Sequence, residues 1–113
     1  MDLNISVEEI EKNIIVRMEG RLDTLSVLGL EKRMDSLLEG NRIYLLMDFS
    51  RIDYLSSAGM RLLLAVTKRA KAKEGYLVIF SIQDDVLELL RIAGLDKVLE
   101  IRKNEKDALQ FRK

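Results

Sequence analysis

The strongest constraint on the fold of this chain is the run RIYLLMDF at residues 42–49, which is almost continuously apolar. A strand with apolar side chains on both sides needs cover on both faces of its sheet, as in parallel sheets that pack against helices. The run YLVIFSI at residues 76–82 has the same character. We therefore expect two buried strands, with helices in the segments around them.

The segments around these runs have the spacing of amphipathic helices. In residues 21–40 the apolar side chains recur at intervals of three and four, which predicts one buried helix face made of Val27, Leu30, Met34 and Leu37. Residues 23–26 offer N-caps for this helix. Further helices are expected at residues 57–74, 83–93 and 105–113, the last of them capped by Asn104. Glycine is the stop signal after the first three helices, at Gly40, Gly75 and Gly94.

The N-terminal residues predict a β-hairpin. Leu3, Ile5 and Val7 alternate with polar residues, as in a half-buried strand. Residues 11–13 suit a turn, and the mostly apolar segment IIVRM at residues 14–18 suits a second strand that returns beside the first.

Two short segments complete the predicted order of elements. SRIDYL at residues 50–55 is expected to be a loop, and KVLEI at residues 97–101 a short strand. The resulting order is β–β–α–β–α–β–α–β–α, which is typical of an α/β fold with a mixed sheet of four or five strands and about four helices packed on it. Because the 113 residues contain no linker or internal repeat, we expect one domain over residues 1–113.

The composition excludes several kinds of site. The sequence holds neither Cys nor His, which rules out disulfides, thiolate nucleophiles, the usual zinc sites and a Ser–His–Asp triad. The 19 basic residues equal the 19 acidic ones, so no overall basic field draws the chain to nucleic acid or to an anionic membrane. No apolar run approaches the roughly 20 residues of a membrane helix, and the first residues lack the pattern of a signal peptide. We expect a cytoplasmic protein with no membrane insertion, no metal and no cofactor.

The segment IDYLSSAGMRLLL at residues 52–64 is the candidate functional site. Ser56 or Ser57 opens the helix that follows, where unpaired backbone N–H groups and the helix dipole favour an anion. A serine hydroxyl at this place can cap the helix, which is worth about 1 kcal/mol. Alternatively, the hydroxyl can accept a phosphoryl group from a partner.

The residues around the two serines suit contact with a partner. Ala58 and Gly59 are small, so that the backbone of a partner could come close. Leu55 and Met60 flank the serines and are expected either in the core or as apolar anchors for a partner. Asp53 is an acidic neighbour, and a phosphate placed near it would add almost two more negative charges to the same surface.

The longer segment LLMDFSRIDYLSSAGMRLLL resembles the STAS-domain family, and within it the anti-sigma factor antagonists. In that family a buried strand leads to Asp-x-Ser, and a short loop then leads to Asp-Ser-(Ser/Thr/Ala)-Gly before an apolar helix. Residues 48–50 resemble the first motif and residues 56–59 the second. MEGRLDTLSV is similar to the family's Gly-x-(Leu/Ile)-Asp segment, with Gly20 and Asp23 in place. The predicted order of elements is also the family's order.

The resemblance implies a switched protein-binding module rather than an enzyme. In the family, the unphosphorylated antagonist binds an anti-sigma factor that is also a GHKL-type serine kinase, and thereby releases the sigma factor. Phosphorylation of one serine ends this binding, and a PP2C-type phosphatase reverses it. By position that serine is Ser57, and Asp23 lies in the loop that faces the kinase. This chain has no phosphate-binding glycine motif, so ATP is expected on the partner, and the free chain is expected to be a monomer.

The sequence departs from the family pattern at one position. Ser56 stands where the family usually has Asp, which removes a negative charge beside the acceptor and supplies a second hydroxyl. Ser57 is the favoured phosphorylated residue, and Ser56 is the second choice.

Two other functions stay open on the sequence alone. A STAS domain can serve as a scaffold subunit of a signalling complex, or as the cytoplasmic partner of a membrane transport system, without being phosphorylated. An enzyme that uses Asp23, Asp48 and Asp53 with a metal is a third alternative, although no motif places these carboxylates together.

Overall fold

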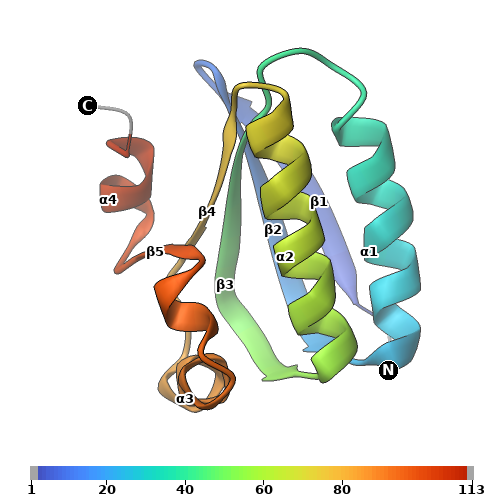
Figure 1. The fold of residues 1–113 in the computed structure, drawn as a ribbon, viewed down its shortest axis with the longest axis vertical. Helices are drawn as coiled ribbons and strands as arrows, with labels where there is room; N and C mark the ends of the chain where they lie inside the picture. The colour runs from blue at the N-terminus through green and yellow to red at the C-terminus, as the bar shows by residue number, and fades with distance from the viewer. Residues whose placement is uncertain (1–2, 112–113) are drawn as a thin grey trace.

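The structure is a computed structural model that describes residues 3–111. Its sheet has the strand order β1-β2-β3-β4-β5 (Figure 1). The strands are β1 (Asn4–Ile10), β2 (Asn13–Leu22), β3 (Tyr44–Leu55), β4 (Tyr76–Phe80) and β5 (Glu100–Arg102). The helices are α1 (Thr24–Leu37), α2 (Ser57–Ala72), α3 (Asp84–Ile92), the 3-10 helix η1 (Leu95–Lys97) and α4 (Glu105–Leu109). β1 pairs antiparallel with β2 and the other neighbours pair parallel, so the predicted order and the mixed sheet are confirmed.

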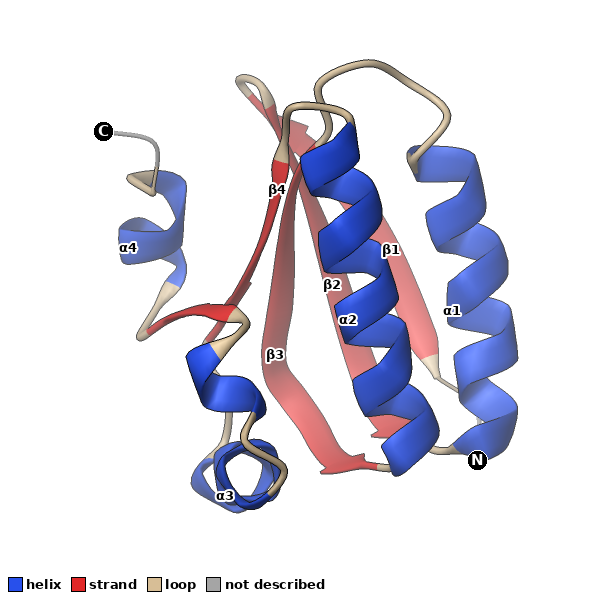
Figure 2. Cartoon of the chain, viewed as in Figure 1, coloured by secondary structure: helices blue, strands red, loops and turns tan. Residues whose placement is uncertain are grey.

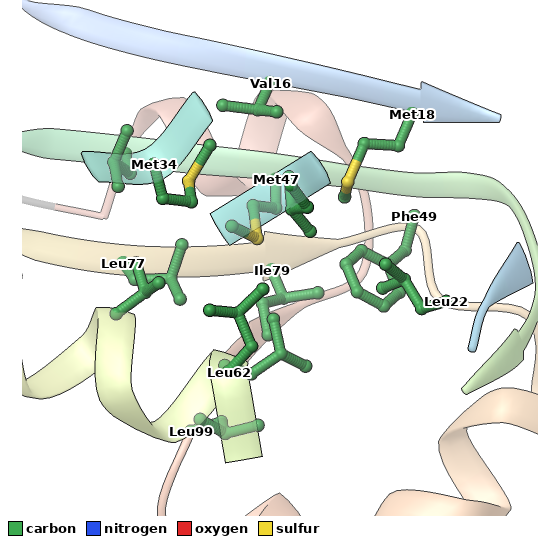
Figure 3. Packing of buried hydrophobic residues seen from close by; sticks show 14 of the residues in the cluster. Val16, Met18, Leu22, Met34, Met47, Phe49, Leu62, Leu77, Ile79 and Leu99 are labelled. Atoms are coloured by element: carbon green, nitrogen blue, oxygen red, sulfur yellow. The ribbon is translucent and has the colours of Figure 1, made fainter. Parts of the chain in front are cut away.

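Helices pack on both faces of the sheet. α1 and α2 lie side by side across one face (Figure 2), and together with α3 they enclose the larger part of the core. Met47 and Ile79 point into this part from neighbouring strands (Figure 3). The alternate residues of the strands point to the other face, where α4 packs, and include Ile15, Leu46, Val78 and Phe80. This two-sided cover explains why residues 42–49 are almost continuously apolar.

The prediction of a loop at residues 50–55 is wrong, because β3 continues through this segment to Leu55. β2 also runs on to Leu22, and the two strands pair in parallel up to the pair Leu22–Leu55. The register shifts twice along this pairing, once on either side of Gly20. Ile52 and Leu55 are buried while the residues between them are exposed. This spacing of three hides the alternation that identifies a strand.

The other differences are at the boundaries of elements. β5 begins three residues later than the strand expected at residues 97–101, because η1 occupies the start of that segment. α4 ends at Leu109, earlier than the helix expected at residues 105–113, and residues 112–113 lie outside the described residues.

Gly75 ends the α2 segment through close packing rather than through its backbone angles. The left-handed residue at this turn is Glu74, with a φ of 61°. A Cβ atom on Gly75 would lie 1.8 Å from the carbonyl oxygen of Ile43, which accepts a hydrogen bond from the amide of Tyr76 at 2.9 Å. Only glycine lets the chain pass this close to the start of β3.

We expect Gly75→Ala to lower the free energy of unfolding by about 2–3 kcal/mol, since the clash involves backbone atoms that cannot rotate away. Gly29→Ala is the matched control, because a Cβ atom there meets nothing within 4 Å. Gly29 lies inside α1, where alanine is favoured by about 1 kcal/mol, so the control should raise the free energy of unfolding. Urea denaturation measures both changes, and equal effects of the two substitutions would contradict this account.

Candidate functional site

Two helices begin side by side at one end of the sheet, directly after two paired strands. Leu22 and Leu55 are partners at the ends of β2 and β3. The next residues, Asp23 and Ser56, are the N-caps of α1 and α2. The amide of Ser56 also donates a hydrogen bond to the carbonyl of Leu22 at 2.8 Å. The starts of α1 and α2 therefore share one surface (Figure 1), which we call the paired-cap surface and define as residues 21–28 and 53–61.

Of the N-cap candidates at residues 23–26, Asp23 caps α1, in a reciprocal arrangement with Ser26. The carboxylate accepts a hydrogen bond from the amide of Ser26 at 3.0 Å, and the hydroxyl of Ser26 accepts one from the amide of Asp23 at 3.0 Å. The Ser26 amide is the main cause that holds the pKa of Asp23 below its ordinary value. Asp23 is therefore a fixed, ionised carboxylate beside the start of α2.

The two adjacent serines have different roles in the structure. Ser56 is half-buried, and its hydroxyl accepts a hydrogen bond from the amide of Gly59 at 3.1 Å, so Ser56 is the N-cap of α2. Ser57 is the first helical residue and is exposed. Within residues 3–111, its hydroxyl makes no hydrogen bond. The capping role thus belongs to Ser56, and Ser57 has a free hydroxyl at the head of the helix.

Two of the residues considered for contact with a partner lie in the core. Leu55 is 2% exposed, and Gly59 is buried. A Cβ atom on Gly59 would lie 2.7 Å from Cδ1 of Leu55 and 3.3 Å from Cβ of Leu22. The small size of Gly59 therefore lets α2 pack on Leu22 and Leu55 at the ends of the strands, rather than leaving room for the backbone of a partner. Of the two positions expected for Leu55, the structure shows the core.

The other expected contact residues are accessible in part. Ala58 and Met60 are half-buried and pack against the core, while Asp53 is exposed. The ring of Tyr54 lies beneath the guanidinium of Arg21, whose carbon is 4.3 Å from the ring centre. The sequence alone indicates no role for Tyr54.

Two exposed leucines of α1 are part of this surface but are not identified by the sequence analysis. Leu25 is 80% exposed and Leu28 is 58% exposed, both within the paired-cap surface. They lie outside the buried stripe that starts at Val27 and Leu30. Apolar residues at the solvent positions of an amphipathic helix were the available signal.

Asp48 of the Asp-x-Ser motif lies in a polar network rather than in the paired-cap surface. Its carboxylate accepts hydrogen bonds from the amide and the hydroxyl of Ser50 at 2.9 and 2.7 Å. Arg17 donates to Asp48 at 2.9 Å, and also to Glu8 at 2.7 Å and to Glu105 at 2.9 Å. Burial raises the pKa of Asp48, but the bonds from Ser50 and Arg17 outweigh burial and hold this pKa below its ordinary value. Arg17 thereby ties β1, β3 and α4 together.

The structure does not unite the three carboxylates considered for a metal site. Asp23 is engaged as a cap, Asp48 is engaged by Arg17, and Asp53 is exposed. No group of three or more Asp, Glu, His or Cys residues suited to a metal ion occurs among residues 3–111. In the same range, no helix has the length and apolar character needed to cross a membrane.

The decisive comparison is with models of protein families. The model of the STAS domain matches residues 4–108. The chain belongs to the STAS-domain family. The resemblance inferred from residues 48–50 and 56–59 is thus confirmed at the level of the family.

Relatives and solved structures agree with this assignment. The chain is 24% identical to the anti-sigma-B factor antagonist of Listeria monocytogenes over 106 residues, which cover 91% of this chain and 93% of the relative. It matches the crystal structure of an anti-sigma factor antagonist from Mycobacterium paratuberculosis with a TM-score of 0.86 at 21% identity, covering 96% of this chain and 92% of the other.

A third similar protein is the anti-sigma factor antagonist SpoIIAA. Its unphosphorylated form matches with a TM-score of 0.79 at 19% identity, covering 96% of each chain. SpoIIAA of Bacillus, described as a cell fate determinant, has also been solved in its phosphorylated form, which matches with a TM-score of 0.69 at 17% identity, covering 97% of this chain and 100% of the other. These structural likenesses show that the STAS fold is shared.

We expect Ser56→Ala to lower the free energy of unfolding of this STAS domain by about 1 kcal/mol, because it removes the N-cap of α2. Ser57→Ala is the matched control and should change the free energy of unfolding by less than about 0.5 kcal/mol, since the Ser57 hydroxyl has no hydrogen bond to lose. Thermal or urea denaturation of the two variants checks this. A larger loss in Ser57→Ala than in Ser56→Ala would show that the capping roles are reversed.

The lowered pKa of Asp48 predicts a pH dependence of stability. The folded-state pKa lies below the unfolded value of about 3.9, so the carboxylate stabilises the fold above that pH and loses this effect as the pH falls through the folded-state value. Asp48→Asn should therefore lower the free energy of unfolding at pH 7 by about 1–3 kcal/mol and flatten its decline below pH 4. Denaturation across this pH range measures both, with the exposed Glu39→Gln as control. A decline as steep in Asp48→Asn as in the unchanged chain would contradict the prediction.

Proposed function

We propose that this chain is an anti-sigma factor antagonist whose binding is switched by phosphorylation of Ser57. In its unmodified form it binds an anti-sigma factor that is also a GHKL-type serine kinase, and so frees the sigma factor. The phosphorylated form lets go, and a PP2C-type phosphatase restores it. The observation that carries this proposal is the exposed, uncommitted hydroxyl of Ser57, next to a Ser56 hydroxyl that is engaged in capping α2.

Membership of the STAS family and the names of the relatives support the proposal. The relative in Listeria monocytogenes is named as an antagonist of an anti-sigma factor. SpoIIAA, with the same fold, exists in an unphosphorylated and a phosphorylated form. The positions of Ser56 and Ser57 favour Ser57 over Ser56 as the acceptor, since modification of Ser56 would disrupt the cap of α2.

The charge of the paired-cap surface explains how a phosphate could act as a switch. The surface carries the carboxylates of Asp23 and Asp53 together with the guanidinium groups of Arg21 and Arg61. Phosphate on Ser57 adds between one and a half and two negative charges and three strong acceptor oxygens. A partner that packs closely here must desolvate the added group. A loss of about 3 kcal/mol would weaken binding roughly a hundredfold.

The kinase partner has to supply the nucleotide in this scheme. The sequence holds no glycine-rich phosphate-binding motif, and the chain offers only the acceptor hydroxyl and a docking surface. The exposed Leu25 and Leu28 extend the docking surface from α2 onto α1. Their side chains give the partner apolar area to bury beside the charged groups.

The proposal is tested by affinity capture from a lysate of the organism that encodes the chain. The baits are Ser57→Ala and Ser57→Asp, and the retained proteins are identified by mass spectrometry. We expect the alanine bait to retain a GHKL-type kinase and the aspartate bait to lose most of it. Ser6→Asp is the control, because it places the same charge on exposed β1, outside the paired-cap surface, and should retain the kinase.

Other outcomes of this capture would contradict the switch. Equal retention of a GHKL-type kinase by the alanine and aspartate baits would show that charge at residue 57 does not control binding. Equal retention of a scaffold or membrane transport protein by both baits would favour the alternative function of the STAS domain.

A further inference from the structure

Arg61 follows Ser57 by four residues on α2, and both residues are exposed. Side chains four residues apart lie on the same face of a helix, one turn of about 6 Å along its axis. Helical side chains point back toward the N-terminus, so the long side chain of Arg61 extends toward the start of α2. A group attached to the hydroxyl of Ser57 is therefore within reach of the Arg61 guanidinium.

Arg61 is not engaged by another group of the described chain. Six other arginines form ion pairs with carboxylates, and Arg21 lies on the ring of Tyr54. In contrast, no ion pair or hydrogen bond involves the side chain of Arg61 within residues 3–111. An arginine without a fixed partner, beside a free hydroxyl, can pair with an anion placed on that hydroxyl.

The surroundings of Arg61 supply one competing carboxylate. Arg61 lines a shallow groove between α1 and α2, together with Glu31, Val27, Ala58 and two further residues of α2. Glu31 carries a single negative charge and forms no ion pair with Arg61 within 4.0 Å. A phosphate close to pH 7 carries up to twice that charge, and its oxygens match the planar fork of a guanidinium. Phosphate on Ser57 should therefore win this competition.

We infer that Arg61 binds the phosphate of modified Ser57 and holds it against the first turn of α2. The inference rests on the proposed phosphorylation of Ser57 and gives the switch a second component. In the unmodified chain Arg61 has no ion-pair partner within residues 3–111, so it is available to an acidic group of the partner. After phosphorylation Arg61 is occupied within the chain, so the partner loses a cation and meets an anion. Arg61 acts here as a positioning residue.

The test uses chain that carries phosphoserine at residue 57 by genetically encoded incorporation, so that no kinase or partner is needed. Phosphorus NMR follows the second ionisation of the phosphate against pH. Pairing with Arg61 favours the dianion, so the phosphate pKa in the unchanged chain should lie about 0.3–1 unit below that in Arg61→Gln. Arg61→Lys should restore part of this difference. Lys68→Gln is the matched control, because this exposed cation lies further along α2 and should leave the titration unchanged.

Each result of the titration decides the inference. A lower phosphate pKa that depends on Arg61 and not on Lys68 supports it. The same titration curve in the unchanged chain and in Arg61→Gln overturns it. Since the phosphoserine is built in, this result is independent of the affinity capture: failure there would remove the partner switch, whereas failure here would remove only the role of Arg61.

Discussion

The parallel pairing of β2 with β3 is the interaction on which the rest of the site depends. Because it continues to the pair Leu22–Leu55, β2 and β3 end at the same edge of the sheet, and a helix begins directly after each strand. The hydrogen bond from the amide of Ser56 to the carbonyl of Leu22 and the close approach of Gly59 to Leu22 then fix α2 against the end of β2. The helix caps, the exposed Ser57 and the carboxylate of Asp23 come to share one surface as a consequence.

A second set of polar contacts, centred on Arg17, lies outside the paired-cap surface. Hydrogen bonds to Glu105 and Glu8, followed by Asp48, raise the pKa of Arg17 above its ordinary value despite its partial burial, so the guanidinium stays charged. The network stabilises the face of the sheet that α4 covers, and it uses Asp48 for that purpose. Asp48 of the Asp-x-Ser motif and Ser57 are close in sequence, yet Asp48 supports the fold whereas Ser57 is exposed.

Much of the fold can be predicted from the sequence, whereas the separate roles of the residues in the site cannot. The apolar runs at residues 42–49 and 76–82 are long enough to predict buried strands by themselves. Residues 50–55 misled the prediction because the irregular pairing around Gly20 spaces Ile52 and Leu55 by three. Both Ser56 and Ser57 can cap a helix, and the two are distinguished by the hydrogen bond that the Ser56 hydroxyl accepts from the amide of Gly59. Leu55 and Gly59 flank an exposed serine in sequence, but their burial depends on tertiary packing that a short segment does not reveal.

We propose that a partner binds this STAS domain through the paired-cap surface. Hydrogen–deuterium exchange of the unmodified chain, with and without the purified anti-sigma factor, tests this claim directly. We expect slower exchange in residues 21–28 and 53–61 on binding, with β1 and α4 unchanged. Slower exchange confined to β1 and α4, with no change at the start of α2, would contradict it.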